Sequence, residues 1–140
     1  MPEKINKWLM AFDFGESRIG VAVANTLLQI PHPLATITGK NKFEKFDKIA
    51  KLIDKWRPSE LIVGMPSASV DKEELIAHIV KFTNRLRHKF KLPVTTVSED
   101  FSSSEASLKL NEQGVRGLSQ VGKLDELSAC GILQVFFSEK

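Results

Sequence analysis

The chain has 140 residues and a mass of 15.7 kDa, a length that predicts one domain over residues 1–140. Hydrophobic residues make up 42% and charged residues 26%, which excludes a disordered or fibrous protein, and the formal net charge of +3 permits a phosphate-rich partner without indicating one. The single cysteine, Cys130, cannot form an internal disulfide, and no apolar run approaches the roughly 18 residues of a membrane span, so we expect a cytoplasmic protein with no membrane association.

The first part of the chain predicts three strands in succession. Residues 8–12 are apolar and predict a buried strand that ends at Asp13, after which Gly15 begins a turn. Residues 19–24 predict a second strand, paired with the first in a hairpin. A third strand is expected near residues 34–38.

Apolar residues then recur every three or four positions, which predicts two amphipathic helices with a strand over residues 60–64 between them. The first helix is expected to begin at Asn41, a capping residue with a glutamate three positions later, and to end at Pro58. The second is expected to begin at Asp71, in the same capping pattern, and to end before Pro93.

The last part of the chain predicts a strand over residues 93–97 and helices over about 103–112 and 124–137. Between these helices, residues 114–123 contain three glycines and no sustained period, which predicts a mobile loop. The whole order predicts an α/β fold whose late strands lie parallel to the first strand and beside it.

Three acidic residues stand where such a fold places chemistry. Asp13 ends the first strand and Glu99 follows the last one, so both are expected at the carboxyl edge of the sheet, and Asp125 can reach that edge from the final helix. Three gathered carboxylates repel one another unless a cation lies between them, and oxygen ligands suit Mg²⁺ or Mn²⁺. Taken singly, each acid also has a structural role open to it, as a turn former, a solvated loop residue or a helix-terminus charge.

Other chemistries lack their motifs in this sequence. The D-F-G sequence at residues 13–15 occurs in protein kinases, but no Gly-rich loop or H-R-D loop accompanies it. Walker A and Rossmann patterns are absent, and the three histidines and Cys130 show no zinc spacing. The serines at 102–104 predict a helix cap rather than a nucleophile.

Five motifs occur in collinear order: D-F-G-x-x-R-I-G-V-A-V, P-L-x-T-I, I-V-G-x-P, L-P-V-x-x-x-x-E and D-x-x-S-A-x-x-I-L-Q. Together they span about residues 9–137 and resemble the YqgF family, which comprises Holliday-junction-resolvase-like proteins also described as "putative pre-16S rRNA nucleases". The resemblance implies an RNase H-like fold, with a mixed five-stranded sheet flanked by helices. It also implies metal-dependent hydrolysis of phosphodiester bonds in the 5′-end processing of pre-16S rRNA.

The family's three acidic positions correspond to Asp13, Glu99 and Asp125, which would act as the catalytic residues and hold two Mg²⁺ or Mn²⁺ ions. Arg18 matches the family's turn arginine and either contacts a phosphate or pairs with a neighbouring acid. The residues expected to contact nucleic acid are Arg18, Ser102, Ser103, Arg116 and Lys123.

The sequence departs from the family at three places. Asp100 replaces an arginine, Asn25 replaces an aspartate, and residues 114–123 contain only Arg116 and Lys123 where the family has a basic run. These departures weaken the expected affinity for nucleic acid.

Four functions stay open at this point. The first is a nuclease acting on structured RNA. The second, a variant of the first, is a resolvase acting on branched DNA, which calls for two active sites in a symmetric dimer. The third is a non-catalytic RNA-binding module of ribosome assembly. The last, an ATP-binding lobe, would need a second lobe that this chain does not contain. We expect a nucleic-acid partner and a monomer or weak homodimer.

Overall fold

The computed structural model describes residues 7–67, 69–98 and 118–139. The helix predicted over about 103–112 lies outside these described residues. So do Glu99, Ser102, Ser103 and Arg116.

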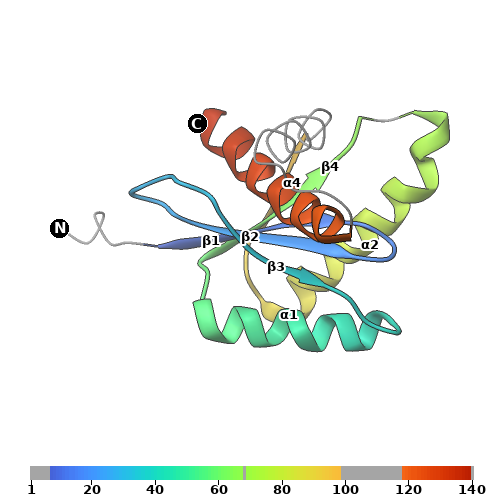
Figure 1. The fold of residues 1–140 in the computed structure, drawn as a ribbon, viewed down its shortest axis with the longest axis horizontal. Coiled ribbons are helices and arrows are strands. Elements are labelled where there is room, and N and C mark those ends of the chain that lie inside the picture. Colours follow the sequence, from blue (N-terminus) through green and yellow to red (C-terminus); the bar gives the residue numbers. More distant parts are fainter. Residues whose placement is uncertain (1–6, 68, 99–117, 140) are drawn as a thin grey trace.

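Five strands form one mixed sheet in the order β3-β2-β1-β4-β5 (Figure 1). The strands are β1 (Trp8–Phe14), β2 (Ile19–Asn25), β3 (His32–Ile37), β4 (Glu60–Met65) and β5 (Val94–Ser98). Strands β1, β2 and β3 pair antiparallel, whereas β1, β4 and β5 run parallel. The predicted mixed sheet is confirmed, and the late strands β4 and β5 lie parallel to the first strand on one side of it, with β4 as its direct neighbour and β5 beyond.

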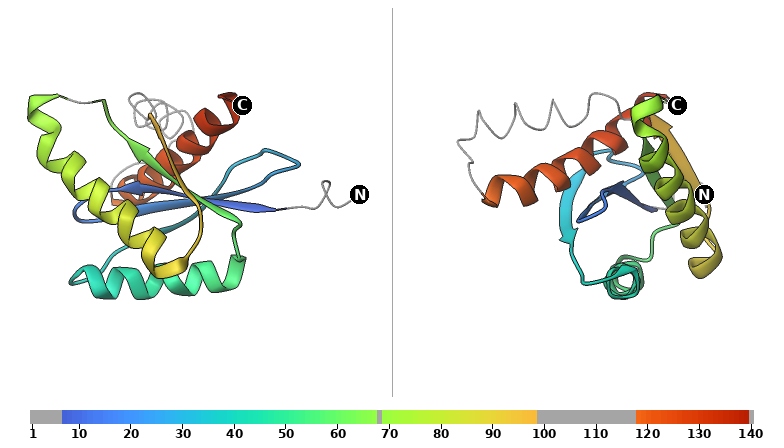
Figure 2. Two further views of the ribbon diagram at one scale, coloured as in Figure 1. Left: turned by 180° about the vertical axis from the view of Figure 1, so that it is seen from behind. Right: turned by 90° about the vertical axis from the view of Figure 1, so that its right-hand side faces the viewer.

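Helices cover both faces of this sheet (Figure 2). On one face lie α1 (Lys42–Trp56) and α2 (Glu73–Phe90), the latter preceded by the 3₁₀ turn η2 (Val70–Lys72). The other face is covered by α4 (Leu118–Ser138). No helix in the described part of the chain is long and apolar enough to cross a membrane.

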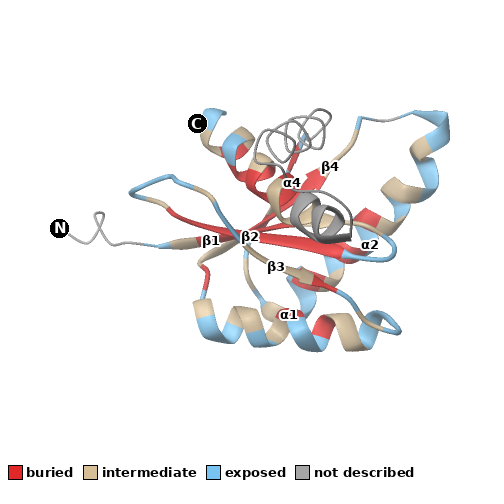
Figure 3. Ribbon diagram, in the orientation of Figure 1, coloured by how far each residue is buried: buried red, intermediate tan, exposed pale blue. Residues whose placement is uncertain are grey.

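The alternation of side chains along β1 divides the core into two layers. Met10 and Phe12 pack with α1 and α2, while Leu9 and Ala11 pack with α4. Figure 3 shows the central strands buried between these layers. The same alternation directs Asp13 toward the α4 face and Phe14 toward the α1 and α2 face.

Local signals set the limits of α1 as expected. The Asn41 side chain accepts a hydrogen bond from the Glu44 N–H at 2.9 Å, which is the predicted cap. The helix ends where Arg57 adopts a left-handed conformation, with φ of 50°, immediately before Pro58.

The predicted cap of the second helix is wrong. Asp71 lies within the 3₁₀ turn, and its carboxylate accepts a hydrogen bond from the Ser69 hydroxyl at 2.7 Å instead of capping α2. This hydrogen bond lowers the pKa of Asp71 below its ordinary value.

The final helix is longer than its sequence indicates. It begins at Leu118, so residues 118–123 of the predicted mobile loop are helical and Lys123 belongs to α4. A glycine inside a helix costs only about 1 kcal/mol, which packing of the remaining helix against the sheet can offset. Residues 114–117 of that loop lie outside the described residues.

Candidate active site

Asp13 occupies the end of β1, beside two strands that carry glycine. It is half-buried and pairs with Gly20 of β2, which in turn pairs with Thr36 of β3. On the other side, continuing the parallel register of β1 with β4 places Gly64 next to Asp13. Because glycine has no side chain, neither neighbouring strand crowds the carboxylate of Asp13.

Helix α4 brings Asp125 onto this part of the sheet. A Cβ atom added to Gly20 would collide with the backbone carbonyl of Asp125 and would lie 3.1 Å from the Asp125 Cβ. Directly opposed Cβ atoms in an antiparallel pair are about 4.5–5.5 Å apart. The Cβ atoms of Asp13 and Asp125 therefore lie within about 9 Å of each other, on the same face of the sheet.

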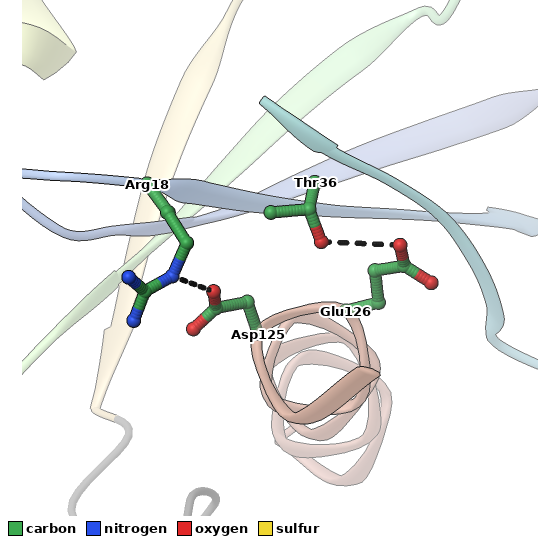
Figure 4. Close-up of polar contacts among 4 residues, drawn as sticks. All are labelled: Arg18, Thr36, Asp125 and Glu126. Carbon is green, nitrogen blue, oxygen red and sulfur yellow. Dashed lines mark hydrogen bonds and ion pairs between the residues drawn. The ribbon is translucent and has the colours of Figure 1, made fainter. Parts of the chain in front are cut away.

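Arg18 holds the Asp125 carboxylate. Its Nε donates to Oδ2 of Asp125 at 2.7 Å (Figure 4). The arginine follows a tight turn in which the Gly15 N–H donates to the Arg18 carbonyl at 2.9 Å. Of the two roles expected for Arg18, pairing with an acid is the one seen, and the side chain stays 43% exposed while that of Asp125 is 21% exposed. The Arg18 side chain therefore remains partly accessible to solvent.

The next residue of α4 fixes the helix on its other side. Glu126 accepts a hydrogen bond from the Thr36 hydroxyl at 3.1 Å, as Figure 4 also shows. Asp125 and Glu126 thus bind side chains on either side of Gly20, which sets the position of α4 across the sheet. Glu126 was not among the predicted site residues, and its only signal in the sequence is the adjacency of two acids at 125 and 126.

The structure brings together two of the three predicted acids, Asp13 and Asp125. Glu99 lies outside the described residues, one position beyond the end of β5 at Ser98. Since β4 separates β1 from β5, the carboxyl ends of these two strands share an edge without being adjacent. Of the predicted nucleic-acid contacts, Arg18 lies beside Asp125, and Lys123 precedes Asp125 in α4.

Asn25, a departure from the family, has a structural role away from this site. It is 7% exposed, and its side-chain oxygen accepts hydrogen bonds from the N–H groups of Leu27 and Leu28 at 2.9 and 3.3 Å. Asn25 pairs with Trp8, at the opposite end of β1 from Asp13. Asn25 therefore lies away from the two acids, and its effect on nucleic-acid binding stays a prediction.

A second group of potential metal ligands was not predicted from the sequence. Ligand atoms of Glu16, Glu74 and His78 all lie within 4.8 Å of one another. Glu74 and His78 are four residues apart on α2, whereas Glu16 belongs to the β1–β2 turn, so only the helical pair left a signal in the sequence. Exposed acidic groups gather at protein surfaces without a metal, and we assign none here.

The Asp13 and Asp125 pair has the chemistry that a divalent cation requires. Both residues offer only oxygen donors when ionised, and Mg²⁺ and Mn²⁺ prefer such hard ligands. Placing two carboxylates on one face of the sheet costs free energy unless positive charge lies near them, and in the structure Arg18 supplies part of that charge. The described residues of the site therefore fit a divalent metal.

The fold is RNase H-like. The structure of Thermus thermophilus RuvC in complex with a Holliday junction substrate aligns with a TM-score of 0.57 at 13% identity, over 94% of each chain. A second T. thermophilus RuvC structure aligns with a TM-score of 0.53, over 94% of this chain and 95% of the other.

The chain belongs to the RuvX family, described as Holliday junction resolvase, whose model matches residues 7–139. A Chromobacterium violaceum protein is 48% identical over 132 residues, which are 93% of this chain and 96% of the relative. A Methylobacillus flagellatus protein is 44% identical over 130 residues, or 92% and 89% of the two chains. Both relatives are named "Putative pre-16S rRNA nuclease", and the resemblance found in the motifs is confirmed.

Proposed function

We propose that this chain is a metal-dependent nuclease that cleaves a phosphodiester bond in the 5′-end processing of pre-16S rRNA in the cytoplasm. The observation that carries the proposal is the placement of Asp13 and Asp125 on one face of the sheet, where Asp13 pairs with Gly20 and the backbone of Asp125 packs on the same glycine. The names of the relatives, which cover nearly the whole chain, support the substrate.

Asp13, Asp125 and Glu99 would be the metal ligands and the catalytic residues. Two bound Mg²⁺ or Mn²⁺ ions would supply activation of a water molecule and stabilisation of the leaving oxygen. The protein's part is to hold the carboxylates in place. Asp13 is positioned by a strand whose preceding residues Leu9 to Phe12 are buried, and Asp125 by a helix seated on Gly20.

Arg18 would bind a substrate phosphate while it keeps Asp125 in position. A guanidinium carries five N–H donors, and the contact with Asp125 uses the one on Nε. The Nη groups take no part in that contact, and the side chain is 43% exposed, so the two roles expected for Arg18 are compatible. Ser102, Ser103, Arg116 and Lys123 are proposed as the further nucleic-acid contacts.

The decisive experiment is cleavage of a 5′-extended small-subunit rRNA precursor with Mg²⁺ or Mn²⁺, comparing the wild type with Asp13→Asn. Asp47→Asn is the matched control, since Asp47 is exposed on α1. We expect cation-dependent cleavage by the wild type and the control, and loss of cleavage in Asp13→Asn. Normal cleavage by Asp13→Asn would refute the proposed site. RNA binding without cleavage by the wild type would favour the assembly module.

Resolution of branched DNA is the second candidate, favoured by the description of the family and by the likeness to RuvC. A four-way junction run beside the rRNA precursor separates the two candidates. Symmetric cutting of the junction would require two sites in one assembly. It should therefore coincide with a dimer in light scattering, whereas a monomer that cuts only the rRNA precursor supports the first candidate.

A further inference from the structure

An aromatic pocket opens on the face of the sheet that α4 does not cover. It lies between the β1–β2 turn, the start of α1 and the middle of α2, and has a volume of about 340 Å³. An adjoining hollow of about 300 Å³ shares its phenylalanine floor and extends along α2. This pocket has no part in the function proposed so far.

The floor of the aromatic pocket consists of three phenylalanines in contact. The ring centroid of Phe82 lies 5.0 Å from that of Phe14 and 5.6 Å from that of Phe46. Phe82 and Phe46 are buried and hold the floor in place, whereas Phe14 is half-buried. Phe14 thus presents an apolar ring to the pocket.

The rim is strongly basic. Cationic side chains come from both helices and from the residues just before α1, and Glu16 is the one carboxylate among the described residues that line the two hollows. The cations are Lys40, Lys42, Lys45, Lys81 and Arg85. An apolar aromatic floor under a cationic rim suits a ligand with a flat apolar part and an attached anion, which describes a nucleotide.

The position of the pocket relates it to the candidate active site. Phe14 directly follows Asp13 in β1, and the two side chains point to opposite faces of the sheet. The pocket and the carboxylates therefore lie at the same end of β1, on opposite faces of the sheet. A base inside a duplex is stacked and paired, so only an unpaired nucleotide can place its base against a protein ring.

We infer that the aromatic pocket binds one unpaired nucleotide of the nucleic-acid substrate, with its base against Phe14 and its phosphate near Lys42 and Lys81. The inference rests on the proposed function, because it assigns the substrate a single-stranded segment beside the cleaved bond. It makes the enzyme selective for a junction between paired and unpaired RNA.

The test measures binding without cleavage. Fluorescence anisotropy in EDTA compares an RNA duplex carrying a single-stranded 5′ extension with the same duplex made blunt. The pocket variant is Lys42→Ala with Lys81→Ala. The matched control is Lys51→Ala with Lys89→Ala, which removes the same charge from exposed positions of the same two helices outside the pocket.

We expect the pocket variant to bind the extended RNA about tenfold or more weakly at about 0.1 M salt and to bind the blunt duplex as the control does. The slope of log affinity against log salt should become shallower by about 0.7, the contribution of the one single-strand phosphate that the variant no longer contacts. Phe14→Leu should weaken extended-RNA binding about fivefold or more, whereas Phe90→Leu, on α2 outside the pocket, should not.

Equal losses in the pocket and control variants, or an equal loss for the blunt duplex, would overturn the inference. Displacement of the extended RNA by AMP alone, at AMP concentrations near the dissociation constant of that RNA, would also overturn the inference. The pocket would then be a site for a free nucleotide. Because binding is measured in EDTA, these outcomes do not depend on cleavage. Failure of the proposed nuclease function would be seen separately in the cleavage assay, as normal cleavage by Asp13→Asn or as no cleavage by the wild type.

Discussion

The backbone carbonyl of Asp125 rests directly on Gly20, where the Cβ of any other residue would collide with it. This contact allows α4 to approach β2 closely enough to place a carboxylate beside the end of β1. The helix is secured on both sides of the glycine, by the Arg18–Asp125 ion pair and by the Thr36–Glu126 hydrogen bond. The separation of the two acids therefore depends on one residue that carries no functional group.

Gly20→Ala should displace α4 and separate the two acids. Because the colliding atom belongs to the helix backbone, the methyl group cannot be accommodated by a side-chain rotation, and we expect a loss of about 1–3 kcal/mol in the free energy of unfolding. Cleavage should fall at least tenfold. Urea denaturation and the rRNA cleavage assay measure the two effects.

Gly39→Ala is the control for this substitution. Its Cβ would come no closer than 3.1 Å to its neighbours, the nearest of which is a flexible lysine side-chain atom. Stability should therefore change much less than in Gly20→Ala. A Gly20→Ala protein with full activity and full stability would contradict the packing described here.

Divalent metal should stabilise the fold through Asp13. A ligand that binds only the folded state adds about 2.7 kcal/mol when its concentration is 100 times its dissociation constant. Mn²⁺ should therefore raise the melting temperature of the wild type, and Asp13→Asn should abolish most of this increase. Differential scanning calorimetry with and without Mn²⁺ measures it.

Glu74→Gln distinguishes the two groups of carboxylates. If the Asp13 site binds the metal, Glu74→Gln should keep the whole Mn²⁺-dependent increase in melting temperature. Loss of the increase in Glu74→Gln, with retention in Asp13→Asn, would place the metal at the cluster of Glu16, Glu74 and His78 instead.

Local sequence signals account for most of the fold. The apolar run before Asp13 predicts β1 because a buried strand needs continuous apolar residues. The cap at Asn41 predicts the start of α1 because the cap depends on residues only three positions apart. The order of the strands in the sheet depends on where each crossover connection places the next strand. No local sequence pattern therefore indicates that β4 lies between β1 and β5. Gly122 and its neighbours do not predict a helix from their own sequence, so the first turns of α4 were not predicted. The helical conformation of these residues depends on the rest of the chain.

The sequence likewise predicts only part of the candidate site. Asp13 stands near the end of β1, as the sequence indicates. Asp125 was expected near the start of the last helix but lies seven residues after its first residue, Leu118. The contacts that hold α4 join residues far apart in the chain, with 107 positions between Arg18 and Asp125 and 90 between Thr36 and Glu126. One sequence does not specify such pairs, because any exposed acid could accept the same hydrogen bond.

Arg18→Ala should separate metal binding from catalysis. Removal of a cation beside Asp125 should strengthen Mn²⁺ binding about two- to fivefold. This change in affinity corresponds to the interaction energy of a partly exposed charge pair. Cleavage should nevertheless decrease, because the phosphate contact is lost. Isothermal titration with Mn²⁺ and the cleavage assay give the two values, and Lys51→Ala, an exposed cation on α1, should change neither. Weaker Mn²⁺ binding in Arg18→Ala would show that the arginine chiefly orients the carboxylate.

Asp100→Arg should introduce the positive charge that the resemblance to the family implies at this position. A new contact to a substrate phosphate should tighten RNA binding and steepen the slope of log affinity against log salt by about 0.7–0.9. The comparison is best made with Asp100→Asn, which removes the negative charge without adding a donor cation. If the two variants bind RNA with the same salt slope, relief of repulsion explains the gain and residue 100 does not contact a phosphate. A steeper slope in Asp100→Arg alone would mean that this chain binds its substrate with one phosphate contact fewer than members of the family that carry the arginine.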